Sequence, residues 1–138
     1  MNDTVRIAAD NYRGGLYCSQ AILSAFCEKY GLDKEIAQRV SFVLNSGIRC
    51  AEVCGAVSGA ILVIGLKHGD SKEIGNVKTE EYMKQFRARH NSVLCRDLLG
   101  CDISTINGRE KAINENLFTT RCLDLVQSAA QLLVDLGY

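Results

Sequence analysis

The segment from Glu52 to His68 is apolar on nearly every side of the helix that its residue spacing predicts. Such a helix has no face to offer to solvent, so it belongs in the centre of a domain with other helices around it. No proline interrupts the 138 residues, and apolar residues recur at helical rather than alternating spacing. A chain of this length fits one domain. The sequence therefore predicts a single all-α domain, residues 1–138, with about five to six helices around a central apolar one.

Glycines and capping side chains mark the ends of the predicted helices. Gly14 and Gly31 end the first two, and Asp33 is a typical N-cap for the third. Thr79 is expected to cap the fifth helix after a polar connector from Gly69 to Val77. The expected helical ranges are 3–13, 17–30, 34–44, 52–68, 79–100 and 120–136, with one short helix before the last.

Charge and hydropathy exclude several classes of function. The 16 basic and 16 acidic residues balance, so no long-range field favours nucleic acid or an anionic membrane. The most apolar stretch, from Val53 to Leu66, is shorter than the roughly 20 residues that cross a bilayer, so we expect no membrane insertion. No secretory signal is visible after Met1, which predicts a cytoplasmic protein. In that compartment cysteines serve metal binding, catalysis or burial rather than structural disulfides.

Four of the seven cysteines fall on four different predicted helices. At about 100° per residue, helical geometry turns Cys18 and Cys122 toward the core and places Cys27 about 180° from Cys18. Only folding can bring such single cysteines together, unlike the local ligand pairs of a zinc finger. The spacing predicts a thiol or metal–thiolate centre built by tertiary structure. For each cysteine, filling the core as a small apolar residue is the alternative. The four cysteines are Cys18, Cys54, Cys95 and Cys122.

Cys54 opens the stretch CGAVSG at the start of the apolar helix. Free N–H groups and the helix dipole stabilise a thiolate at such a position. Gly55 and Gly59 remove side-chain bulk, so a cofactor or a neighbouring helix can lie close to them, and both readings stay open. Cys50 is expected in the loop before this helix, as a spare ligand or as the thiol that resolves an oxidised Cys54. Cys101 is expected to be exposed and outside the centre.

Local cofactor motifs are missing. The chain has no C-x-x-C, which argues against zinc-ribbon and thioredoxin chemistry, and no C-x-x-C-H for covalent haem attachment. Phosphate-binding loops, H-E-x-x-H and G-x-S-x-G are also absent, so no nucleotide site is predicted. His68 is expected to cap a helix C-terminus. His90 falls on a different face from Cys95.

The cysteine pattern resembles the C_GCAxxG_C_C family of redox-active proteins, small proteins defined by four cysteines. The resemblance extends from the stretch YCSQAIL, which begins at Tyr17, to the final helix. Its most specific parts are EVCGAVSGA from Glu52 and CRDLLG from Cys95. Two departures are the additional Cys50 and Leu123, which stands where proline often follows the last cysteine. They affect local loop geometry and leave the four cysteines intact.

The resemblance implies a redox function in which the family's cysteines correspond to Cys18, Cys54, Cys95 and Cys122. The family is also similar to the non-haem part of split-Soret cytochromes, which implies a cysteine-bound iron–sulfur cluster.

Three functions remain open from the sequence. The first is a [2Fe–2S] cluster, or another thiolate-bound metal, that the four cysteines hold for electron transfer or redox sensing. The second is cluster-free dithiol–disulfide exchange, with Cys54 as the attacking thiolate and Cys50, Cys18 or Cys95 as the thiol that resolves it. The third is a non-catalytic helical interaction module, including a homodimer, whose cysteines fill the core. A structural zinc site is a variant of the first. The sequence does not indicate an electron-transfer partner or an enzymatic reaction.

Overall fold

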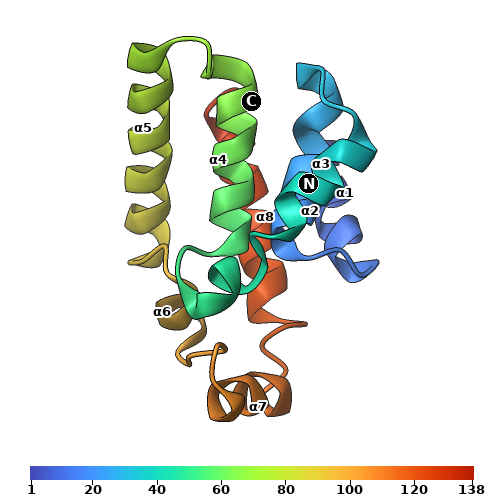
Figure 1. Ribbon diagram of the computed structural model, residues 1–138, viewed down its shortest axis with the longest axis vertical. Coiled ribbons are helices and arrows are strands. Elements are labelled where there is room, and N and C mark those ends of the chain that lie inside the picture. The colour runs from blue at the N-terminus through green and yellow to red at the C-terminus, as the bar shows by residue number, and fades with distance from the viewer.

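The computed structural model describes all 138 residues, and helices joined by short turns account for most of them (Figure 1). The all-α prediction is confirmed, since the one β feature is an isolated bridge between Val53 and Leu94. No helix combines the length and the apolar character that spanning a bilayer requires. The helices are α1 (Asp3–Arg13), α2 (Cys18–Phe26), α3 (Lys34–Phe42), α4 (Gly55–His68), α5 (Lys72–His90), α6 (Cys95–Leu99), α7 (Ile106–Asn114) and α8 (Arg121–Asp135).

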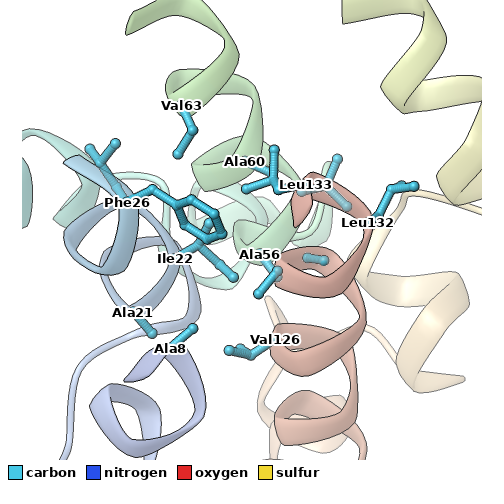
Figure 2. Close-up of a cluster of buried hydrophobic side chains, with 14 of the residues drawn as sticks. Ala8, Ala21, Ile22, Phe26, Ala56, Ala60, Val63, Val126, Leu132 and Leu133 are labelled. Atoms are coloured by element: carbon cyan, nitrogen blue, oxygen red, sulfur yellow. The ribbon is translucent and has the colours of Figure 1, made fainter. Parts of the chain in front are cut away.

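Helices α2 and α4 form the centre of the molecule. The contact between them is the most extensive of any helix pair, and α4 also packs against α5 and α8. Figure 2 shows Ile22 and Phe26 of α2 among Ala56, Ala60 and Val63 of α4. The central place predicted for the apolar helix is therefore confirmed, and its neighbour α2 has an even larger share of buried residues.

Gly59 lets α2 and α4 approach closely. A Cβ atom added at Gly59 would lie 2.7 Å from the carbonyl oxygen and 3.1 Å from the Cα atom of Ser19. These are backbone atoms of α2, which cannot move aside unless the whole helix moves. Gly65 on the same helix has no atom within 4 Å of an added Cβ. Close packing therefore requires glycine at position 59 and not at position 65.

The start of the fifth helix was predicted at the wrong residue. Helix α5 begins at Lys72, because the side chain of Ser71 accepts a hydrogen bond from the N–H of Ile74 and caps it. Most of the expected connector is thus helical. Thr79 lies inside the helix, and its hydroxyl donates a hydrogen bond to the Gly75 carbonyl, 2.8 Å away.

The end of the fifth helix was also predicted wrongly. Helix α5 ends at His90, because Asn91 adopts a left-handed conformation with φ of 67°. Asparagine tolerates that conformation better than most residues do. Cys95 consequently begins a separate short helix, α6, and does not lie near the end of a long one.

Candidate metal–thiolate centre

Each of the four grouped cysteines lies at the beginning of a helix. Cys54 is the N-cap of α4, Cys18 and Cys95 are the first residues of α2 and α6, and Cys122 is the second residue of α8. The beginnings of α4 and α8 lie at the end of the bundle that is nearest to α6 and α7 (Figure 1).

One cavity of about 510 Å³ is lined by all four of these cysteines. Cys54 and Cys95 are buried, whereas Cys18 and Cys122 are half-buried. No carboxylate lines the cavity, and its other walls are largely apolar. Residues of these walls include Leu16, Leu99, Ile103, Phe118 and Leu125. The fold thus gathers four thiols that are far apart in the sequence.

A two-stranded contact places Cys54 beside Cys95. The N–H of Cys54 donates to the Val93 carbonyl at 2.8 Å, and the N–H of Cys95 donates to the Glu52 carbonyl at 2.7 Å. The guanidinium of Arg96 also pairs with the carboxylate of Glu52 at 2.9 Å. These bonds fix the segment before α4 against the segment before α6. The backbone of Cys54 is therefore held beside that of Cys95.

Two side chains fix the beginning of α8 and with it Cys122. The Nε of Arg121 donates to the Leu98 carbonyl at 3.0 Å, which joins α8 to α6. The hydroxyl of Tyr12 donates to the carbonyl of Phe118 just before α8. Burial and the charge of Cys54 raise the pKa of the Cys122 thiol, and the same hydroxyl acts on that pKa in the opposite sense. Tyr12 is thus a polar group of α1 in the wall of the cavity.

The two glycines of the CGAVSG stretch have different surroundings. Gly55 lines the cavity, and a Cβ atom added there would overlap the Sγ atom of Cys18. Gly59 does not line the cavity and faces the backbone of α2. The structure gives Gly55 a place beside the sulfurs and Gly59 a role in helix packing.

The remaining three cysteines lie outside the cavity lining. Cys27 is buried in the main core, where its sulfur donates to the Ser24 carbonyl at 3.6 Å. Cys50 is exposed in the loop before α4, and its sulfur donates to the Gly47 carbonyl at 3.2 Å. Cys101, which was expected to be exposed, is half-buried and packs against the small cluster that contains Cys95. All seven cysteines are free thiols.

Burial raises the pKa of every thiol in the cavity. The pKa of Cys95 and that of Cys122 rise to about 12, and the pKa of Cys18 rises well above its usual range. The second cause for all three is the charge of a Cys54 thiolate. The four sulfurs are therefore close enough to influence one another, and a cation among them would remove this repulsion.

The N-terminus of α4 lowers the pKa of the Cys54 thiol less than expected. The N–H groups of Ala56 and Val57 and the charge of Arg121 all lower the pKa of its thiol. Burial raises that pKa by more, so the net shift is upward. The helix N-terminus does lower the pKa of Cys54, but burial outweighs this effect. The prediction of a lowered pKa is therefore wrong for the free thiol.

The free thiols predict a pH dependence of stability. A folded-state pKa of about 12 for Cys95 and Cys122, against an ordinary 9.0, means that the native state holds these protons more tightly. The stability that this contributes is complete below pH 9 and is lost as the pH rises toward 12. We expect the free energy of unfolding of the metal-free protein to fall by about 1.4 kcal/mol per pH unit for each thiol in this window. Urea denaturation at several pH values measures this fall in the free energy of unfolding. A denaturation midpoint that does not change between pH 9 and 11 would contradict the prediction.

The spacing of the thiols does not suit a single metal ion. No three His, Cys, Asp or Glu side chains lie close enough together to hold one ion. Four thiolates around one zinc ion stand about 3.8 Å apart, given zinc–sulfur bonds of about 2.3 Å. In a [2Fe–2S] cluster each iron takes two thiolates at a similar separation, and only the two pairs of ligands stand further apart.

Sequence reasoning did not identify Tyr12, Arg121 or Arg109 as residues of this site. Tyr12 belongs to the apolar side of the first predicted helix, and nothing in that pattern singles out its hydroxyl. The two arginines fall among ordinary charged residues of helix surfaces. The place of Arg109 in the cavity wall, and the position of Arg121 near the thiols, depend on how α1, α7 and α8 meet, which no local spacing predicts.

A comparison with known families agrees with this arrangement of cysteines. Residues 16–136 match the family described as "Putative redox-active protein (C_GCAxxG_C_C)". No curated protein and no solved structure matches the chain. The matched region covers most of the chain and includes every cysteine that lines the cavity. The chain therefore belongs to the C_GCAxxG_C_C family of redox-active proteins.

Proposed function

We propose that the four cysteines of the cavity jointly hold a [2Fe–2S] cluster and that the protein transfers electrons or senses redox state through it. The observation that carries the proposal is the meeting of four thiols, from the beginnings of four helices, at one cavity. Iron–sulfur clusters take four thiolate ligands. The ligands would be Cys18, Cys54, Cys95 and Cys122.

The surroundings of the sulfurs suit an anionic centre. Helices α2, α4 and α8 each have nine or more residues, and their N-terminal ends direct partial positive charge toward the cavity. The guanidinium of Arg121 acts on Cys54 and on Cys122 in the same sense. A bound cluster would supply one-electron chemistry at a potential set by these charges, by hydrogen bonds to sulfur and by exposure to solvent.

The structure gives less support to the other two functions. Dithiol exchange by Cys54 needs a thiolate near neutral pH, whereas burial raises the pKa of this thiol. Of its suggested partners, Cys50 lies outside the cavity, whereas Cys18 and Cys95 line it and burial raises the pKa of their thiols too. Core filling describes Cys27, which is fully enclosed by apolar side chains. It does not account for four thiols around about 510 Å³ of space.

Metal analysis tests the proposal. The full chain is purified anaerobically and, in parallel, reconstituted with iron and sulfide. We expect a coloured protein with about two iron ions and two acid-labile sulfide ions per chain. A colourless chain that stays free of iron after reconstitution would overturn the proposal. So would a chain that holds zinc and rejects iron, since zinc has no redox chemistry.

Tyr12→Phe tests the contact between α1 and the centre. The variant removes the hydroxyl that interacts with Cys122 and keeps the ring in the cavity wall. With a cluster bound, this hydroxyl would donate to the sulfur of Cys122 in place of the Phe118 carbonyl. A hydrogen bond to a ligand sulfur stabilises the reduced state, so its loss should lower the reduction potential. If the bond contributes about 1 kcal/mol, the change is about 40 mV for one electron.

Tyr17→Phe is the matched control for this measurement. Tyr17 lines the same cavity, but its ring makes an edge contact with Phe42 at 5.5 Å. The reduction potential of the Tyr17→Phe variant should equal that of the unmodified protein in a spectroscopic redox titration. Equal potentials for Tyr12→Phe and the unmodified protein would remove Tyr12 from the site.

A further inference from the structure

We propose that the cavity also binds a small organic carboxylate with an apolar body, and that the guanidinium of Arg109 holds the carboxylate. This site is defined by the cavity and by Arg109, and it does not depend on the identity of the metal.

The cavity has room for such a molecule. Pockets for small organic ligands in proteins have volumes of about 300–1,000 Å³, and this one has about 510 Å³. The cysteines come from the beginnings of α2, α4, α6 and α8. Arg109 of α7 and Phe118, which follows α7, form another part of the wall. The thiols and the guanidinium therefore line one space and come from different helices.

Arg109 has no anionic partner in the protein. Its guanidinium carbon lies 5.7 Å from the centroid of the Phe118 ring, and its side chain is half-buried. None of the six ion pairs in the structure includes it. By contrast, Arg13 in the same wall pairs with Asp10 at 3.2 Å. A half-buried guanidinium that faces a cavity without a counter-charge is a binding group for an anion.

A different arginine, Arg121, lies near the proposed cluster ligands. Arg121 acts on the thiols of Cys54 and Cys122, whereas Arg109 is not among the groups that shift any thiol of the cavity. Arg109 is thus free to serve a second anion.

The walls of the cavity indicate the rest of the ligand. Planar guanidinium groups bind carboxylates through two parallel hydrogen bonds, which fixes the orientation of the bound group. The lining contains no carboxylate that would repel such a ligand. Ile103, Leu99 and Phe118 offer apolar contacts for its body.

Binding of benzoate, with benzamide as its neutral counterpart, tests the site. The full chain, purified anaerobically, is titrated with each probe by isothermal titration calorimetry. We expect saturable binding of benzoate, and binding of benzamide that is at least tenfold weaker. Arg109→Gln should weaken benzoate at least tenfold, and Arg109→Lys should retain part of the affinity because the charge remains.

Arg87→Gln is the control variant, since Arg87 is exposed on α5 and does not line the cavity. Its affinity for benzoate should be unchanged. Iron is measured on the same samples, so failure of the cluster proposal and failure of this one are separate results. Absence of saturable benzoate binding would overturn the carboxylate site, as would equal affinities for the two probes. Loss of iron in Arg109→Gln with unchanged benzoate affinity would assign Arg109 to the cluster and also overturn it.

Discussion

Replacing Cys54 with serine is expected to lower the iron and sulfide content of the chain at least tenfold. The charge of this thiolate raises the pKa of the other three thiols of the cavity, so its sulfur lies within reach of all of them. A serine hydroxyl is a poor substitute for a thiolate as a ligand to iron. Loss of one of four ligands should therefore release the cluster or leave it unstable.

Two other cysteines are controls for this experiment. Cys50→Ser changes an exposed thiol outside the cavity and should keep the full iron content. Cys27→Ala changes a thiol enclosed in the main core and should lower the free energy of unfolding without loss of iron. If Cys54→Ser retains all its iron, the cavity thiols are not the ligands. If it loses stability alone, the four cysteines are core residues.

Gly59→Ala is expected to destabilise the fold by about 1–3 kcal/mol. The added methyl group would stand 2.7 Å from the Ser19 carbonyl oxygen, so α2 and α4 would have to move apart. These two helices form the most extensive contact in the molecule, and both carry a cysteine of the cavity at their beginnings. Iron content should fall together with stability.

Gly65→Ala is the matched control on the same helix. Its added methyl group meets nothing within 4 Å, and the residue is exposed. Because alanine has the higher helix propensity, this variant should be more stable by up to about 1 kcal/mol. Urea denaturation of both variants measures the difference. A Gly59→Ala protein as stable as Gly65→Ala would contradict the close packing of α2 against α4.

Local chemistry accounts for the parts of the fold that the sequence predicted well. The bounds of α1 and the side-chain cap at Asp33 follow from short-range patterns, and both appear as expected. The apolar surroundings of α4 follow from its composition. The break between α5 and α6 depends instead on Asn91, a residue that more often continues a loop or a helix without turning left-handed. No glycine or proline marks that position.

The candidate site could be predicted only in part. Spacing grouped the four cysteines and separated Cys27, and the structure places the former at the cavity and the latter in the core. The bridge that aligns Cys54 with Cys95 joins backbone segments some forty residues apart, so no local pattern records it. The cavity itself and the free guanidinium of Arg109 exist only after α7 and α8 have packed against the beginnings of the other helices.

A crystal structure of the anaerobically purified protein, with anomalous data collected at the iron absorption edge, tests the central claim most directly. We expect iron peaks inside the cavity, bonded to the sulfur atoms of Cys18, Cys54, Cys95 and Cys122. Iron bound elsewhere on the chain, or four uncoordinated thiols around the cavity in a protein that has been supplied with iron and sulfide, would contradict it.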